Sequence, residues 1–329
     1  MNRVYIIVPV FNADRYLREC LESIKKQSDK NFMCIMVDDG STDTSEKICK
    51  DFAADDSFVL ISQKNAGVSA ARNTGLDYVY QNAAETDFVT FIDSDDTVRE
   101  DFLESFWKSQ AFSKVDAFET VWVCGWRKIQ MGNEIHLLKT ADDDRAKVFS
   151  GDIISDFESL DAFFGTVWAN FYNVKTLKTN GLKFNRNFNL CEDTLFNFAF
   201  IDKIRNYVFI NDCLYNYRVF SESLSHKLEP NEKKFNSLYD GYFIPRVQYF
   251  QKNVIQNNAY ILNKLIANLV FWFIQTPCYK KCYKLKKYVN LQYCRTLGQK
   301  RVLFCLKYNL LWLYKLYLKC KRLDETSSL

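Results

Sequence analysis

The chain has 329 residues, of which 48% are hydrophobic, so it is long enough to bury one large core and a smaller one. Its formal net charge is +4, but residues 260–329 hold 14 Lys or Arg and only 2 Asp or Glu, which predicts an acidic body with a basic tail. No apolar run reaches the roughly 18 residues of a membrane span, and the eleven scattered cysteines favour a reduced, cytoplasmic protein over a disulfide or zinc scaffold.

Four strand-then-helix units are predicted in about the first 110 residues. Each strand is an apolar, β-branched or aromatic run, and the helix after the first strand carries an apolar stripe at i, i+3, i+4 and i+7. Such units predict a mostly parallel sheet with helices on its faces. The strands are residues 3–10, 32–37, 58–62 and 88–92, and the stripe is Leu17, Cys20, Leu21 and Ile24.

The pattern changes after about residue 115. Two runs joined through residues 131–133 predict a hairpin, and residues 140–190 are irregular. Residues 192–201 follow as a predicted helix, and residues 206–220 as one or two further strands. From about residue 231 to the end, the chain is predicted to be helical.

Clustered carboxylates follow two of the predicted strands: Asp38 and Asp39 after the second, and Asp93, Asp95 and Asp96 after the fourth. Like charges at contact distance disfavour each other's ionised state, so a fold keeps such a cluster where a cation neutralises it. Ligands of open α/β sheets bind at the carboxyl ends of strands. The pattern therefore predicts an enzyme that binds a metal-bridged diphosphate.

Other readings of the same residues were weighed. An EF-hand loop starting at Asp93 would have Val98 where the sharp bend needs glycine, and a strand precedes it where a helix is required. Asp95 or Asp96 could instead cap a helix starting near Thr97, which would explain one carboxylate of the three. The first strand-to-helix turn lacks GxGxxG, no P-loop is present, and His136 and His226 are the chain's two histidines, which disfavours dinucleotide, zinc and triad chemistry.

A family resemblance rests on five blocks in the first 110 residues: IIVPVFN, YLRECLESIKKQ, VDDGSTD, NAGVSAARNTGL and FIDSDD. In this order and spacing they resemble the nucleotide-binding half of the family 2 glycosyltransferases with the A fold. CEDTLF at 191–196 is similar to the ED motif of inverting members, and residues 167–173 and 215–225 are similar to blocks of bacterial surface-polysaccharide transferases. The QxxRW motif of processive synthases is absent. The resemblance implies a Rossmann-like nucleotide-diphospho-sugar transferase fold and a non-processive enzyme.

The resemblance also implies a donor site. Pro9, Phe11 and Asp39 correspond to positions that line the nucleoside pocket, and Asp39 would accept a hydrogen bond from uracil, which favours a UDP-sugar. Arg72 is expected beside the base-binding carboxylate or the diphosphate, with a structural salt bridge as the alternative. The DxD region would hold Mn²⁺ or Mg²⁺ on the diphosphate, with Asp95 as the most direct ligand and Asp93 and Asp96 beside it.

The same resemblance assigns the acceptor side. Asp193 is the candidate general base, supported by Glu192, and the alternative is that Asp193 only caps a helix. Trp168 and Arg218 are the candidate residues of the acceptor side. Direct displacement by the acceptor would invert the anomeric centre. Cys191 precedes the acidic pair and is interpreted as a packed cysteine.

The expected organisation is a catalytic domain over residues 1–230, with a nucleotide-sugar half (1–112) and an acceptor half (113–230), and a basic helical region over 231–329. Residues 260–329 either lie on the cytoplasmic membrane surface, where Trp, Tyr and Lys favour the headgroups, or pack on the body or on another copy. No nucleic-acid-binding motif accompanies the charge. The predicted protein transfers a sugar from a UDP donor to a saccharide or lipid-linked saccharide; the rival is a non-catalytic binding module on the same fold.

Overall fold

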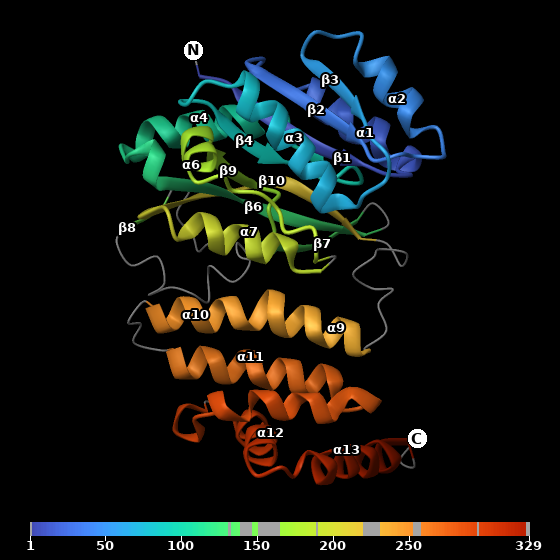
Figure 1. Cartoon of the computed structure of the whole chain (residues 1–329), viewed down its shortest axis with the longest axis vertical. Coiled ribbons are helices and arrows are strands. Elements are labelled where there is room, and N and C mark those ends of the chain that lie inside the picture. Colours follow the sequence, from blue (N-terminus) through green and yellow to red (C-terminus); the bar gives the residue numbers. More distant parts are fainter. Residues whose placement is uncertain are drawn as a thin grey trace. The chain divides into compact units, whose positions relative to one another are not determined.

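The computed structural model describes residues 2–130, 133–138, 147–150, 165–188, 190–219, 231–252, 258–294 and 296–326. The chain divides into two compact units, residues 1–223 and 224–329, and each contains buried apolar side chains of its own (Figure 1). The loop 140–145 and His226 of the sequence analysis lie outside the described residues.

The first unit starts with four parallel strands, as predicted. They lie in the order β3-β2-β1-β4, with Val4 of β1 opposite Phe32 of β2 and Phe88 of β4. All seven residues of β1 are buried, which explains its unbroken apolar sequence: strands covered on both faces do not alternate. The strands are β1 (Val4–Val10), β2 (Phe32–Asp38), β3 (Phe58–Ser62) and β4 (Phe88–Phe91).

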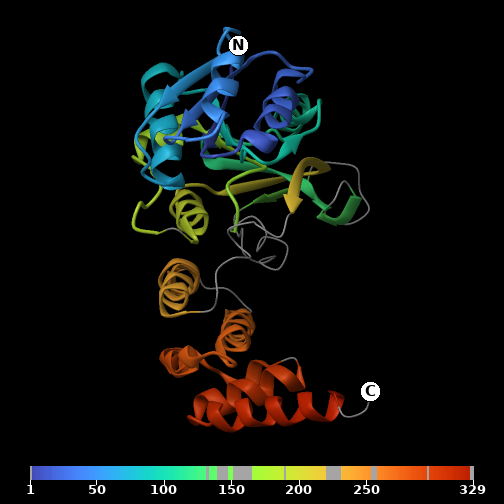
Figure 2. The same ribbon diagram turned by 90° about the vertical axis from the view of Figure 1, so that its right-hand side faces the viewer.

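Helices cover both faces of this sheet (Figures 1 and 2). On one face, α1 (Asp14–Lys25), α2 (Ser45–Phe52) and α4 (Phe102–Ser113) share a core with Val4, Ile6 and Val8. On the other face lie α3 (Val68–Asn82), next to Ile7, and α7 (Glu192–Ile201), whose Phe196 contacts Phe91. The predicted stripe of α1 is confirmed, because its buried residues are Leu17, Cys20, Leu21 and Ile24.

The remaining strands make the sheet mixed. In the described residues, β9 runs antiparallel to both β4 and β6, β10 runs parallel to β6, and β5 and β8 run antiparallel to β10. The prediction of a mostly parallel sheet therefore holds for the first four strands and not for the whole sheet. These strands are β5 (Thr97–Val98), β6 (Thr120–Gln130), β7 (Asn133–Leu138), β8 (Lys147–Ser150), β9 (Asn170–Asn173) and β10 (Asn206–Val219).

Two local predictions about these strands can be compared with the structure. The hairpin is confirmed, since β6 and β7 pair antiparallel, while residues 131–132 of its turn lie outside the described residues. Residues 206–219 form the single strand β10, whose register against β6 shifts between Ile210 and Cys213. A short helix, α6 (Val174–Thr179), follows β9, and a 3-10 turn, Ala117–Glu119, precedes β6.

The second unit is helical throughout its described residues, as predicted. α9 (Glu232–Ser237), a π-helical segment (Leu238–Phe243) and α10 (Ile244–Lys252) follow one another without a break. Then come α11 (Asn258–Phe273), 3-10 segments at Pro277–Tyr288 and Leu291–Tyr293, α12 (Leu297–Lys307) and α13 (Leu311–Thr326). Ile266, Val270, Leu285, Leu303 and Leu306 are among its buried residues. Among the described residues, no helix is both long and apolar enough to cross a membrane.

Candidate functional site

The segment after β2 folds around the Asp39 carboxylate. Its Oδ1 accepts hydrogen bonds from Gln63 Nε2 (2.6 Å) and the Ala66 amide (2.9 Å), and its Oδ2 accepts one from the Gly67 amide (2.8 Å). A carboxylate has about four acceptor positions, so three are used by the loop that leads into α3. Asp39 therefore holds this loop against the carboxyl end of β2 and keeps one acceptor position on Oδ2.

The turn after Asp39 requires glycine. Gly40 has φ +73°, and a Cβ there would lie 2.9 Å from the Asn65 amide nitrogen. This is the left-handed region that side chains with a Cβ rarely adopt, and the contact would push the Asp39 loop outward. Of the other two residues predicted to line the nucleoside pocket, Pro9 is buried within β1, whereas Phe11 has 49% of its surface exposed. Phe11 thus presents an accessible aromatic ring at the end of β1.

The segment Asp93–Asp96 joins β4 to β5. The Asp93 amide donates to Tyr215 Oη (3.2 Å), and Tyr215 Oη donates to Asp96 Oδ2 (2.7 Å). The Arg218 amide donates to the other oxygen of Asp96 (2.7 Å), and Asp96 is completely buried. Burial and the neighbouring Asp95 and Asp93 carboxylates raise the pKa of Asp96 well above its ordinary value. Asp96 therefore fastens the segment to β10.

The alternative in which Asp95 or Asp96 caps a helix is wrong. Thr97 and Val98 form strand β5, paired with β10, and helix α4 begins only at Phe102, with Asp101 in the N-cap position. Pairing with β10 is a long-range interaction that the local sequence does not reveal. The carboxylates of this segment therefore need another explanation.

A divalent cation fits the carboxylates that remain. Burial and the Asp93 charge raise the pKa of Asp95 to about 6, which marks a carboxylate without adequate neutralisation. Within the described residues, no group of three or more His, Cys, Asp and Glu could hold a metal ion by itself. Mg²⁺ sites of nucleotide enzymes usually combine one or two carboxylates with substrate phosphates, and that is the donor set that Asp95 and Asp93 offer.

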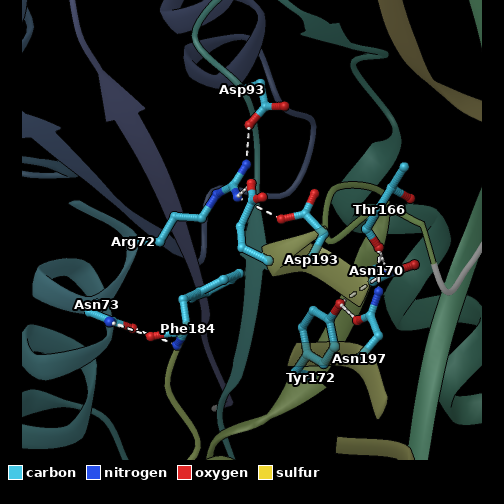
Figure 3. A network of polar contacts seen from close by, with 10 residues as sticks. Arg72, Asn73, Asp93, Thr166, Asn170, Tyr172, Phe184, Asp193 and Asn197 are labelled. Carbon is cyan, nitrogen blue, oxygen red and sulfur yellow. Dashed lines mark hydrogen bonds and ion pairs between the residues drawn. The ribbon is translucent and has the colours of Figure 1, made fainter. Parts of the chain in front are cut away.

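Arg72 connects this segment to the start of α7 (Figure 3). Its Nη2 contacts Asp93 Oδ1 at 2.9 Å, and its Nη1 contacts Asp193 Oδ1 at 2.6 Å and Glu192 Oε1 at 3.2 Å. The Arg72 side chain is only 4% exposed, and the Phe184 ring lies 5.3 Å from its guanidinium carbon. One cation thus joins the predicted donor-side carboxylate to the predicted base.

Asp193 lies in the first turn of α7, one residue after Glu192. The N-cap position is occupied by Cys191, which has φ +66°, so the alternative in which Asp193 is a helix cap is wrong. Burial raises the pKa of Asp193 well above its ordinary value, the charges of Glu192 and Asp93 add to this, and Arg72 opposes it. A carboxylate with a raised pKa accepts a proton more readily near neutral pH.

A buried polar network holds α7 in position (Figure 3). Tyr172 Oη donates to Asn197 Oδ1 (2.6 Å), and Asn197 Nδ2 donates to the Thr166 carbonyl (2.7 Å). Asn73, one residue after Arg72, exchanges two hydrogen bonds with the backbone of Phe184. The sequence analysis missed these residues, because single Asn and Tyr residues in apolar runs carry no pattern that marks them as partners.

The two candidate acceptor-side residues lie near the Asp93–Asp96 segment. Trp168 is buried and stacks on Tyr215, with ring centres 4.6 Å apart, and on Tyr217 at 5.4 Å. Arg218 Nη2 contacts Glu19 Oε2 at 2.8 Å, and its guanidinium carbon lies 4.4 Å from the centre of the Tyr16 ring. Trp168 therefore supports Tyr215, which positions Asp93 and Asp96. Tyr215 belongs to a block that the resemblance singled out, although no role was predicted for it.

The fold and the site together define a nucleotide-diphospho-sugar transferase of the A-fold class. Residues 5–122 match the family model described as glycosyl transferase family 2. The chain therefore belongs to family 2 of the glycosyltransferases, and the predicted family and fold are confirmed.

Curated relatives match the chain over different lengths. It is 48% identical to glycosyltransferase GlyA of Streptococcus pneumoniae over 108 residues, which are 32% of this chain and 15% of GlyA. It is 29% identical to the putative glycosyltransferase EpsH of Bacillus subtilis, over 71% of this chain and 65% of EpsH. The minor teichoic acid biosynthesis protein GgaA of Bacillus subtilis is also 29% identical, over 71% of this chain and 51% of GgaA. The chain thus spans less than two thirds of the length of each of these relatives.

Solved structures share the fold. S. aureus TarS 1-349 in complex with UDP-GlcNAc superimposes with a TM-score of 0.73 at 18% identity, covering 98% of this chain and 92% of that chain. The mannosyltransferase PcManGT from Pyrobaculum calidifontis, in complex with GDP-Man and Mn²⁺, gives a TM-score of 0.51 at 15% identity, covering 96% of this chain and 82% of that chain. At these identities the likeness concerns the fold alone.

Proposed function

We propose that this chain is an inverting glycosyltransferase that moves a sugar from a UDP-sugar to a saccharide acceptor. The observation that carries the proposal is Arg72, which pairs with Asp93 at the carboxyl end of β4 and with Asp193 at the start of α7. A sugar-transfer site needs a group that handles the diphosphate and a base for the acceptor, and Arg72 brings candidates for both within one cluster. A TarS structure that contains UDP-GlcNAc supports a UDP donor.

On the donor side, the Phe11 ring packs against the uracil, and Asp39 uses its remaining acceptor position for the imide N–H. Pro9 acts through the buried backbone of β1. Asp95 and the second oxygen of Asp93 are the residues that would hold Mn²⁺ or Mg²⁺. When bound, the cation neutralises the charge that develops on the leaving diphosphate. Asp96 is a positioning residue, since both of its oxygens already accept hydrogen bonds from the protein.

On the acceptor side, Asp193 takes the proton from the acceptor hydroxyl. The hydroxyl oxygen forms a bond to the anomeric carbon as the bond from that carbon to the UDP oxygen breaks. Attack opposite to the leaving group inverts the anomeric centre, so an α-linked donor yields a β-glycoside. Glu192 and Arg72 orient Asp193, and we assign Arg72 to positioning, because its two terminal nitrogens are engaged by carboxylates.

The setting we propose is cytoplasmic surface-glycan assembly, such as capsule, lipopolysaccharide or teichoic acid. The relative GgaA carries the name minor teichoic acid biosynthesis protein, which supports such a role. The transferred group would be a hexose or an N-acetylhexosamine, added once or a few times per encounter. Trp168 and Arg218 stay candidates for the acceptor side. A lipid-linked saccharide acceptor would place residues 260–329 at the cytoplasmic membrane surface.

Release of UDP from a panel of UDP-sugars, with Mn²⁺ or with EDTA, tests this function. We expect slow hydrolysis of one donor in Mn²⁺, little in EDTA, and loss of release in Asp95→Ala and Asp193→Asn. Donor binding by calorimetry separates the two variants, because Asp193→Asn should still bind the donor. Binding of UDP without release, even with saccharide acceptors, would favour a binding module, and failure to bind any nucleotide would contradict the proposal.

A further inference from the structure

Helix α12 in the second unit exposes an apolar side. Leu297 is 64% exposed, and Phe304 and the following Tyr308 are also exposed, whereas Val302, Leu303 and Leu306 are buried in the unit. Positions 297, 304 and 308 lie about two and three turns apart and so fall on one side of the helix. Large apolar side chains here are not needed to fill the core of the unit, because other residues of the same helix fill it.

Helix α13 repeats this arrangement. Trp312 is 47% exposed, and Leu313, Leu316 and Tyr317 are exposed as well, while Leu311 and Tyr314 are buried. α12 and α13 are in contact (Figure 2). Contiguous exposed apolar patches on a protein surface mark interaction sites, whereas single exposed residues are ordinary. We refer to the exposed side chains of these two helices as the docking surface.

Basic side chains accompany the apolar ones. Lys300, Arg301 and Lys307 of α12 are exposed and stand between the apolar positions. The sequence from residue 260 to residue 323 contains no Asp or Glu, so no acidic side chain in this stretch compensates the charge. The docking surface therefore combines Trp, Tyr, Phe and Leu with positive charge.

We propose that the docking surface binds an anionic membrane surface. This inference deepens the proposed membrane association of residues 260–329 and names the helices and the lipid chemistry. Lys and Arg attract anionic headgroups, and Trp and Tyr favour the depth of the headgroups. The apolar side chains would enter the boundary between headgroups and acyl chains, as in interfacial helices. A second copy of the chain is a poorer occupant, because two surfaces of the same positive charge repel each other.

Vesicle flotation of the full chain tests the proposal without any donor or acceptor, so its result does not depend on the sugar-transfer reaction. The vesicles contain either phosphatidylcholine alone or phosphatidylcholine with phosphatidylglycerol. One variant removes charge (Lys300→Gln, Arg301→Gln, Lys307→Gln) and another removes apolar area (Phe304→Ala, Trp312→Ala, Leu316→Ala). Control variants make the same kinds of change on the first unit (Lys26→Gln, Lys47→Gln, Lys178→Gln; and Phe112→Ala), where these residues are exposed. Circular dichroism melts check that every variant is folded.

We expect the wild type to float with the anionic vesicles and to be released by salt. Loss of three charges should weaken partitioning by on the order of 100-fold, and the apolar variant should also lose binding, while the controls behave as the wild type. Failure of the wild type to bind anionic vesicles would overturn the proposal, as would equal binding by the folded docking-surface variants. Sedimentation that shows a dimer dispersed by these variants, without vesicle binding, would assign the surface to a second copy instead.

Discussion

Arg72 holds a buried position with three carboxylates around it. Its ion pairs with Asp93, Glu192 and Asp193 offset the cost of burying the guanidinium, and they raise the pKa of Arg72, so that it stays charged. One cation among three carboxylates leaves excess negative charge when all are ionised. That excess is consistent with the raised pKa of Asp193 and favours a divalent cation nearby.

Arg72→Lys tests the positioning role. Lysine keeps the charge but is a point donor that cannot span Asp93 and Asp193 as the guanidinium fork does. We expect kcat to fall by about 10- to 100-fold, with little change in the donor KM, because Asp193 loses its orientation. Steady-state kinetics of donor turnover measure the split. Arg18→Lys, which alters an exposed ion pair with Asp51, is the matched control and should be neutral.

The opposite pattern would contradict this role. An increase in the donor KM at unchanged kcat would mean that Arg72 binds the donor directly. Thermal melts of both variants show whether the substitution also destabilises the fold.

The pKa of Asp95 predicts how metal binding depends on pH. This carboxyl must lose its proton to bind a cation, and its pKa is raised to about 6, so the ionised fraction falls as the pH drops below that value. We expect the apparent Kd for Mn²⁺, measured by calorimetry with a saturating UDP-sugar, to be level from pH 7 to 8. Below pH 6 it should rise about tenfold per unit, whereas an ordinary Asp would delay this rise to about pH 4.

The choice of ligand and variant keeps this measurement clear. A UDP-sugar has no terminal phosphate monoester, which would itself titrate near pH 6. Asp95→Asn should bind Mn²⁺ weakly at every pH, without the rise. A Kd that is constant down to pH 5 in the wild type would exclude Asp95 as the titrating ligand.

At the scale of elements, the close approach of α3 to β1 positions Arg72. A Cβ on Gly75 would lie 2.6 Å from Cγ2 of Ile7, a distance that real Cβ atoms do not show. Gly75 is one turn beyond Arg72 on the same helix, so the glycine allows α3 to lie directly against the sheet. An invariant packing distance here sets how far the Arg72 guanidinium reaches.

Gly75→Ala should therefore destabilise the protein by about 1–3 kcal/mol, through overpacking of a buried contact. Urea unfolding measures this free energy. Gly298→Ala is the control, because no atom lies within 4 Å of a Cβ there, and alanine favours the helix by up to about 1 kcal/mol. Combining Gly75→Ala with Ile7→Ala should cost less than the sum of the single changes; strict additivity would argue against the contact.

Elements were predictable where a residue's own neighbours determine the pattern. β1 to β4 and α7 match their predicted ranges within about two residues, because burial on both faces or one face leaves a continuous or periodic apolar signal. The two-residue strand β5 was not predicted, since it exists only through pairing with β10. The antiparallel insertion of β9 between β4 and β6 likewise depends on partners more than 70 residues away.

At the scale of the whole molecule, the chain has two compact units. We expect calorimetric unfolding in more than one step, because each unit buries its own core. A UDP-sugar with Mn²⁺ at about 100 times its Kd should stabilise the first unit by about 2.7 kcal/mol and raise its transition by roughly 5–10 °C. The transition of the helical unit should stay in place. A single transition that shifts as one would contradict this independence.

The sequence by itself determined the family, the fold of the first 110 residues and the identity of the acidic residues at the strand ends, because motifs and apolar periodicity are local properties of the chain. Tertiary structure alone decided how those acids divide their roles. It buries Asp96 between Tyr215 and the Arg218 amide, leaves Asp95 with a raised pKa, and joins Asp93 to Asp193 through Arg72. Burial and charge partners arise from segments up to about 120 residues apart, and no local pattern records such distances.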